Sequence, residues 1–267
     1  MKSHLIKYAK GIVGQYYQTE GNNKLVIYLW WAPNLPSAMD KEIWLLASNW
    51  FDLVRPDYYG YARSDWFFST KNCIQTIYNT IQVFNDRLPV FSIYATQEII
   101  PSQYNEIILI GASYGWWIAS IMPRFDTKVQ EIVLMYPALD RLDRNEHGHK
   151  EATDEDFLRE YSLWYKHLYR FEEGIDPYEA MLDIEEFWII TDISHLQNTK
   201  VFIWHGSADN IIWAWRSQKF FDQLKEMNPK GDYHYAEYYG LWHGWTCKEA
   251  TLKGRLHRRK QFENNNI

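Results

Sequence analysis

Residues 111–115, Gly-Ala-Ser-Tyr-Gly, place a serine between two glycines directly after an apolar stretch. That stretch, residues 106–110, has the composition of a buried strand. A serine on a sharp turn from strand to helix has a strained backbone, and glycines beside it let neighbouring backbone approach closely. Its hydroxyl points away from the sheet, so Ser113 is a candidate nucleophile. The alternative is an ordinary turn that uses Gly and Ser for flexibility.

A serine hydroxyl is a weak nucleophile, so it requires a base and a third group that orients the base. Asp209 ends the run His-Gly-Ser-Ala-Asp, which follows the strand-like residues 201–204. His243 lies in Gly-Leu-Trp-His-Gly, which follows the strand-like residues 233–239. The order Ser, Asp, His, with each residue in a loop after a strand, predicts acyl transfer in which His243 is the base and Asp209 its orienting acid.

Other polar residues compete for these roles. Asp209 also suits a turn in which the carboxylate accepts hydrogen bonds from its own backbone. His147 and His149 make a weak metal pair without further ligands at the usual spacing. His195, at the end of the insertion, could reach the cleft, but we assign it no role. We expect neither a metal nor a cofactor.

The elements that position these residues alternate between strand-like and helix-like stretches, which predicts an α/β protein with a mostly parallel sheet wrapped by helices. One stretch, residues 140–198, breaks the alternation because it is charged and aromatic with helical spacing. The expected domains are therefore a core, residues 1–139 and 199–267, and an insertion, residues 140–198. We expect a hairpin at 5–8 and 12–18, strands at 25–31, 50–55, 106–110, 129–135, 201–204 and 233–239, and helices at 39–47, 70–85, 113–121, 213–227 and 243–257.

Composition restricts the class of protein and its partners. The chain has 267 residues, 46% hydrophobic and 23% charged, which is typical of a soluble globular protein. A net charge of −6 gives no dedicated nucleic-acid surface, and the basic C-terminal stretch suits a last helical turn. No apolar run is long enough to span a membrane, and the N-terminus lacks the apolar core of a secretory signal. Two distant cysteines, Cys73 and Cys247, do not indicate a disulfide framework, so the expected location is cytoplasmic.

These segments carry a family resemblance. The chain resembles serine hydrolases of the α/β-hydrolase fold: residues 205–209 and 238–244 are similar to the acid and histidine loops of the prolyl-oligopeptidase-like and dienelactone-hydrolase-like branches. Residues 56–64 resemble the loop after the fourth strand of many such enzymes. The resemblance spans roughly residues 25–244 and implies a catalytic triad of Ser113, Asp209 and His243.

The resemblance also implies further roles. His205 is similar to the structural histidine of its loop, and Asp140 is the alternative acid because some relatives carry it after the sixth strand. The insertion after that strand implies a helical cap that covers Ser113 and excludes water, whereas a peripheral insertion away from substrate is the alternative.

Two departures concern the oxyanion hole and the turn after Ser113. The backbone N–H of Tyr114 is the expected first donor. The loop that supplies the second donor in many relatives reads His-Gly, but here it reads Ala-Pro-Asn-Leu-Pro over residues 32–36, so we assign the donor to Asn34, with Leu35 or Ala32 as alternatives. Trp116 stands where the peptidase branch usually has a further glycine, which favours an esterase over a peptidase.

Aromatic residues make up 18% of the chain, and several lie near the three candidate catalytic residues. We expect Trp116, Trp213 and Trp242 to line a pocket for an apolar or aromatic acyl group. The leading function is cleavage of a small ester, and the first alternative is a peptidase or amidase that acts on short peptides. An acyltransferase differs only in the acceptor, and a non-catalytic binding protein is the third class. The oligomeric state stays open.

Overall fold

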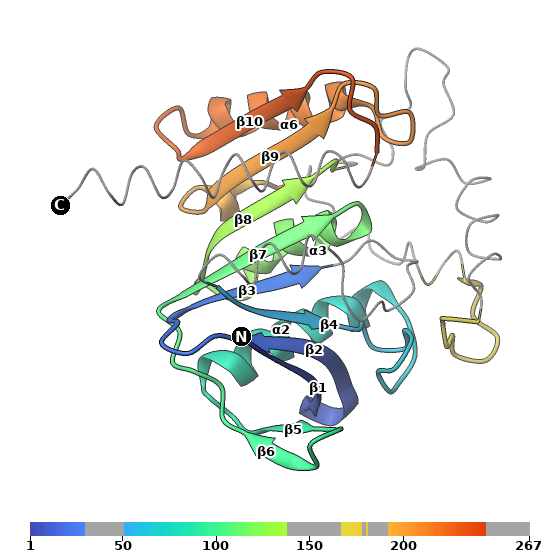
Figure 1. The fold of residues 1–267 in the computed structure, drawn as a ribbon. Coiled ribbons are helices and arrows are strands. Elements are labelled where there is room, and N and C mark those ends of the chain that lie inside the picture. The colour runs from blue at the N-terminus through green and yellow to red at the C-terminus, as the bar shows by residue number, and fades with distance from the viewer. Residues whose placement is uncertain (30–50, 138–166, 178–179, 181–191, 244–267) are drawn as a thin grey trace.

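A ten-stranded mixed sheet organises the described part of this computed structural model, which comprises residues 1–29, 51–137, 167–177, 180 and 192–243 (Figure 1). Its strand order is β10-β9-β8-β7-β3-β4-β2-β1-β5-β6. The strands are β1 (Lys2–Tyr8), β2 (Ile12–Gln18), β3 (Lys24–Leu29), β4 (Asp52–Pro56), β5 (Val90–Ser92), β6 (Gln97–Ile99), β7 (Glu106–Ala112), β8 (Val129–Met135), β9 (Lys200–Gly206) and β10 (Tyr233–Tyr238).

The sheet has a parallel half and an antiparallel half. Strands β10, β9, β8, β7, β3 and β4 pair in parallel. Strands β2, β1, β5 and β6 continue from β4 with antiparallel pairing. Because parallel strands end at the same edge, the loops that follow β7, β8, β9 and β10 lie beside one another.

Burial on both faces explains the composition of the central strands. Strands β3, β7 and β8 are almost continuous runs of Val, Ile, Leu and Met, and nearly every residue in them is buried, as is usual for strands of a parallel sheet. One core cluster includes side chains of the helices α2 (Thr70–Asn85), α3 (Tyr114–Ile121) and α6 (Ala214–Met227), such as Ile77, Ile118 and Phe220. A second cluster gathers side chains of alternate strand positions, such as Val26, Ile108 and Val133.

The predicted fold class is confirmed, and the observed elements match most of the expected ones. The N-terminal hairpin, the six core strands and the helices α2, α3 and α6 all form within a few residues of the expected bounds. The hairpin of β5 and β6 was not predicted, because each strand has only three residues and carries little periodicity. The expected helices at 39–47 and 243–257, and most of the insertion 140–198, lie outside the described residues.

A described piece of the insertion binds the loop after β4. Two backbone hydrogen bonds join Arg170 to this loop, from its N–H to the Gly60 carbonyl (2.8 Å) and from the Phe68 N–H to its carbonyl (2.6 Å). The ring of Tyr169 packs edge-on to Phe68, with centroids 4.6 Å apart. The same loop is braced internally by Asp57, whose carboxylate accepts hydrogen bonds from the Arg63 guanidinium at 2.7 and 3.1 Å.

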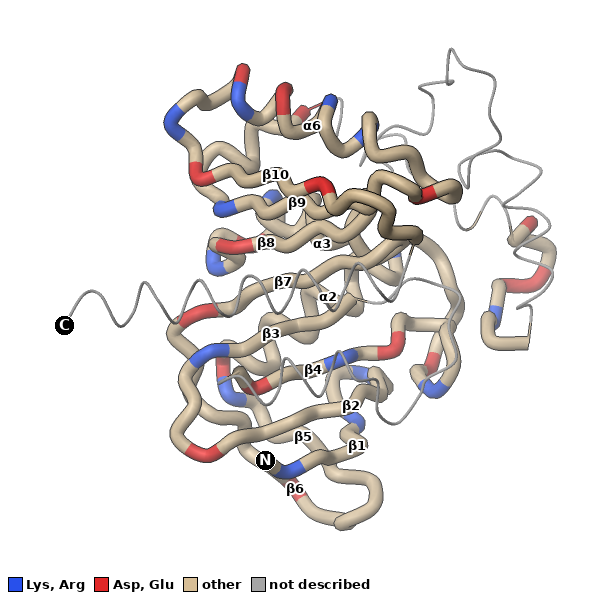
Figure 2. The backbone as a smooth tube through the Cα atoms, turned by 45° about the horizontal axis from the view of Figure 1, so that its top comes forward, with Lys and Arg blue, Asp and Glu red and all other residues tan. Residues whose placement is uncertain are grey.

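Charged residues are interspersed along the described chain. Figure 2 shows both acidic and basic positions along α6 and at the strand ends. Within the described residues, no helix combines the length and apolar character that crossing a membrane requires.

Candidate active site

Ser113 occupies a strained turn between β7 and α3. Its φ of 50° and ψ of −122° lie outside the regions that non-glycine residues favour. Its backbone N–H donates to the Met135 carbonyl at the end of β8 (3.1 Å), and the residue is half-buried. Strain of about 1–3 kcal/mol persists only where the surroundings impose it, and it is common at active sites.

The glycine two residues before Ser113 makes this turn possible. A Cβ on Gly111 would lie 2.4 Å from the Gly115 carbonyl oxygen and 2.5 Å from the Trp116 Cα. Strand β7 and the first turn of α3 therefore approach too closely for any other residue. This contact gives the Gly-x-Ser-x-Gly pattern its physical basis.

Tyr114, the expected oxyanion donor, is the first residue of α3. The first N–H groups of a helix have no acceptor within that helix, so this backbone can serve a ligand oxygen. The side chain of Tyr114 takes no part in this role, because its hydroxyl is buried beside Cys73 and Thr70. This burial raises the pKa of the phenol well above its ordinary value. Asn34, the second expected donor, lies outside the described residues.

The carboxylate of Asp209 is buried in the loop after β9, where it accepts three hydrogen bonds and faces a second histidine. Its Oδ1 accepts the backbone N–H groups of Ile211 and Ile212, both at 2.9 Å. Its Oδ2 lies 2.7 Å from Nδ1 of His243 and 3.1 Å from Nε2 of His205. The turn interpretation and the catalytic interpretation of Asp209 are thus compatible, since each uses a different oxygen.

These contacts determine the charge of Asp209. Burial alone would raise its pKa, but the hydrogen bonds from His205 and His243 outweigh burial and hold the pKa of the carboxyl well below its usual range. An ionised carboxylate only accepts hydrogen bonds, so Nδ1 of His243 carries the proton in this contact. The lone pair of that imidazole then resides on Nε2, as a general base requires.

The loop carrying His243 packs directly on the end of β9. Backbone N–H groups of Ser207 and Ala208 donate to the carbonyls of Tyr238 and Leu241, both at 3.0 Å. A Cβ on Gly206 would lie 2.2 Å from the Leu241 carbonyl oxygen, so this approach also requires glycine. Gly206 therefore allows the loop that carries His243 to pack against the loop that carries Asp209.

Tyr136 is a site residue that sequence reasoning missed. It follows β8, between the strands that carry Ser113 and Asp209, and its ring centroid is 4.5 Å from that of His243. Its φ of 44° is unusual for a bulky residue. A single tyrosine after a strand carries no recognisable signal, so only the sheet order reveals its place.

The expected pocket tryptophans have different environments. Trp116 is 5% exposed and belongs to the core cluster of α3, so the structure places it in the interior rather than on an open surface. Trp213 immediately precedes α6 and is half-buried. Trp242, the neighbour of His243, is 63% exposed.

The competing histidines have contacts of their own. His195 accepts from Arg124 Nε at Nδ1 (3.1 Å) and faces the Ser120 carbonyl through Nε2 (2.9 Å), and burial lowers its pKa. It therefore joins the segment 194–196 to the end of α3. Asp140, His147 and His149 lie outside the described residues. Across the described part of the chain, no three His, Cys, Asp or Glu side chains are placed to hold a metal ion.

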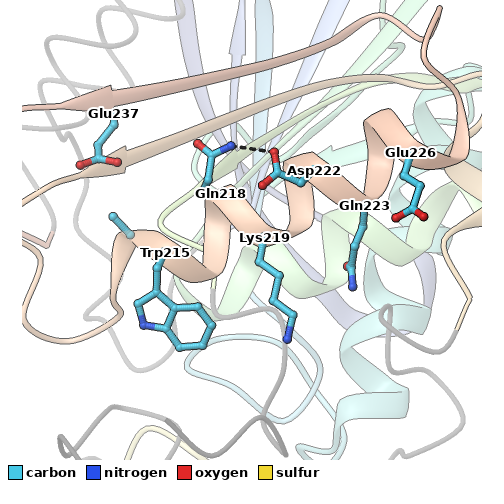
Figure 3. A pocket seen from close by; sticks show the side chains of 8 residues that line it. Trp215, Gln218, Lys219, Asp222, Gln223, Glu226 and Glu237 are labelled. Carbon is cyan, nitrogen blue, oxygen red and sulfur yellow. Dashed lines mark hydrogen bonds between the residues drawn. The ribbon is translucent and has the colours of Figure 1, made fainter. Parts of the chain in front are cut away.

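A separate open hollow lies along the outer face of α6. Its lining includes Trp215, Lys219, Asp222 and Glu226, and Gln218 donates to Asp222 Oδ1 at 2.8 Å within it (Figure 3). None of Ser113, Asp209 and His243 lines this hollow. Its exposed, charged rim differs from the enclosed, mainly apolar character of most small-molecule sites.

No family model and no curated protein matches the chain by sequence. Solved structures do match over nearly its whole length. An esterase from Pyrococcus furiosus has a TM-score of 0.64 at 16% identity, covering 99% of this chain and 92% of that one. A monoacylglycerol lipase from Paleococcus ferrophilus has a TM-score of 0.57 at 15% identity, with 92% and 97% covered. An α/β serine hydrolase without a lid from Xanthomonas campestris has a TM-score of 0.58 at 12% identity, with 96% and 92% covered.

At these identities the likeness concerns the fold. It agrees with the predominantly parallel sheet flanked by helices. The chain has the α/β-hydrolase fold.

Proposed function

We propose that the protein is a serine hydrolase that cleaves an ester bond of a small apolar or aromatic substrate through an acyl-enzyme on Ser113. The observation that carries this proposal is the contact of 2.7 Å between His243 Nδ1 and Asp209 Oδ2, at the sheet edge where Ser113 stands on its strained turn. An ionised acid against Nδ1 orients the imidazole and stabilises the imidazolium that forms during catalysis.

The reaction follows from these roles. The Ser113 hydroxyl oxygen bonds to the acyl carbon while its proton passes to Nε2 of His243, and the alcohol then leaves with that proton. Water next attacks the acyl-enzyme, gives a proton to Nε2, and the acid departs as Ser113 recovers its hydroxyl. The Tyr114 N–H, at the start of α3, is assigned to the oxyanion, with Asn34 as the second donor. Each such donor contributes about a hundredfold or more in rate.

Structural neighbours support the hydrolase class. Those named above are described as an esterase, a lipase and a serine hydrolase. We extend this class to the present chain because its candidate nucleophile, acid and base follow β7, β9 and β10, at the same end of the parallel strands. The ester preference rests on Trp116 in place of a glycine and on the half-buried Trp213 and exposed Trp242 near the site.

The test is covalent labelling with a fluorophosphonate, followed by peptide mapping. We expect a label on Ser113 in the wild type, none in Ser113→Ala, and strongly reduced labelling in His243→Ala. His234→Ala is the matched control: His234 is an exposed histidine of β10 that pairs with Asp232 at 2.6 Å, and its loss should leave labelling unchanged.

Substrates then separate the enzyme classes. Hydrolysis of p-nitrophenyl esters of increasing acyl length is expected, with little turnover of aminoacyl amides. Preferential amide turnover would instead establish the peptidase or amidase. An unlabelled, inactive wild type would contradict catalysis and favour a binding protein with this fold.

A further inference from the structure

Asp209 contacts a second histidine, on the side of its carboxylate away from backbone donors. Nε2 of His205 lies 3.1 Å from Oδ2 of Asp209, the same oxygen that contacts His243. The side chains of His205 and Asp209 are both fully buried, so solvent does not compete for this contact. The turn itself uses only Oδ1 of Asp209, so the buried His205 beside Oδ2 requires a separate explanation.

The surroundings of His205 identify which nitrogen carries its proton. Besides Asp209, Nε2 faces the backbone carbonyl of Ile212 at 2.7 Å. Both neighbours of Nε2 are acceptors, so this nitrogen bears the hydrogen. In a neutral imidazole the other nitrogen is then an acceptor.

A serine hydroxyl of α6 contacts this second nitrogen, Nδ1 of His205. The Oγ of Ser217, on α6, lies 2.6 Å from Nδ1 of His205, and Ser217 is fully buried. The hydroxyl therefore donates to Nδ1. Its loss would leave a buried imidazole nitrogen without a donor, and the ring would tilt or turn to find one.

We propose that Ser217 and His205 are positioning residues for Asp209: the hydroxyl holds the imidazole so that its Nε2–H, between the Ile212 carbonyl and Oδ2 of Asp209, keeps the carboxylate in place, and through it the ring of His243. The proposal rests on the proposed function, since Asp209 is its acid. It extends the site from the loops at the strand ends into α6, through Ser217, His205, Asp209 and His243 at successive distances of 2.6, 3.1 and 2.7 Å.

The experiment compares Ser217→Ala with Ser120→Ala. Both serines are fully buried on helices, but the Ser120 hydroxyl donates to the Trp117 carbonyl of its own helix, at 2.7 Å. We expect Ser217→Ala to lower kcat for a p-nitrophenyl ester about tenfold with little change in KM, less than the hundredfold that follows from misplacement by about 1 Å. Ser120→Ala should keep the wild-type kcat.

Imidazole nitrogen NMR gives a readout that does not depend on turnover. Wild-type His205 should show a protonated Nε2 and an unprotonated Nδ1. Ser217→Ala should shift the Nδ1 resonance of His205 and also the Nδ1–H resonance of His243, and Ser120→Ala should shift neither. His205→Gln, which keeps one amide donor, is expected to retain more activity than His205→Leu.

Two results would overturn the proposal. One is a wild-type spectrum with both His205 nitrogens protonated, because Ser217 would then accept rather than donate. The other is a Ser217→Ala protein whose His243 resonance matches that of Ser120→Ala. If Ser113 fails to react with a fluorophosphonate, the proposed function falls, and the spectra still show whether Ser217 and His205 hold Asp209 against His243.

Discussion

The imidazole of His243 lies against the phenol ring of Tyr136, with centroids 4.5 Å apart and planes inclined by 53°. Tyr136 is 1% exposed, and its backbone N–H donates to the Trp204 carbonyl of β9 at 2.8 Å. The tyrosine is therefore fixed by the sheet itself, at the end of the strand between those that carry Ser113 and Asp209. Asp209 holds one edge of the imidazole, and Tyr136 supports one of its faces.

Removal of the Tyr136 ring should disturb catalysis more than binding. We expect Tyr136→Leu to lower kcat for an ester about tenfold to a hundredfold, because the imidazole loses a supporting face and a misplacement of about 1 Å costs this much. KM should change little. Steady-state kinetics of purified variants measure both constants.

Tyr136→Phe is the control for this prediction. It keeps the ring that faces His243, so its kcat should stay within a few-fold of the wild type. Equal losses of kcat in the Phe and Leu variants would show that the hydroxyl, rather than the ring, is what matters.

Replacing Asp209 by asparagine should nearly abolish turnover. The amide presents a donor where Nδ1 of His243 needs an acceptor, which favours the wrong imidazole tautomer and lowers kcat by about 10⁴-fold in comparable triads. Asp232→Asn provides the comparison, because Asp232 also contacts a histidine but at an exposed site. A kcat for Asp209→Asn close to that of Asp232→Asn would exclude Asp209 as the catalytic acid and direct attention to Asp140.

Asp209 should also make stability depend on pH. Its pKa is depressed in the folded protein, chiefly by hydrogen bonds that outweigh its burial. The stabilisation from its charge is therefore fully present above the unfolded-state pKa of about 3.9 and is lost as the pH falls below it toward the folded-state value. We expect the difference in unfolding free energy between wild type and Asp209→Asn to shrink below pH 4, by at most about 1.4 kcal/mol per pH unit. Urea unfolding from pH 7 to pH 3 measures it, and a constant difference would contradict the assignment.

Gly206 should tolerate no side chain. A Cβ there would lie 2.2 Å from the Leu241 carbonyl oxygen, so Gly206→Ala must displace the loop that carries His243. Overpacking of this kind costs about 1–3 kcal/mol, and we expect activity to fall with stability.

Gly174→Ala is the matched control for Gly206→Ala. Gly174 has a φ of +83°, but nothing lies within 4 Å of an added Cβ. It should lose only about 1–2 kcal/mol from its backbone conformation and keep full activity. Thermal unfolding and ester turnover of both variants test the pair, and an active Gly206→Ala protein would show that the histidine loop adapts.

Local signals were enough to predict much of this protein. Apolar runs identified the core strands, and the glycines at 111 and 206 pointed to the turns beside Ser113 and Asp209, because strand burial and close backbone approach leave a mark on the residues concerned. Chain order alone placed Asp209 and His243 after successive strands. The contact between their side chains, predicted from that order, is present in the structure at 2.7 Å.

Tertiary structure decided which other side chains meet at the site. Tyr136 faces His243 only because β8 lies between β7 and β9, and Ser217 reaches His205 only because α6 packs behind the acid loop. The tertiary structure also buries Trp116, an expected pocket residue, in the core cluster that includes α3. Residues that contact through packing, far apart along the chain, obey no fixed spacing, so their partners follow from the folded arrangement and not from the sequence pattern.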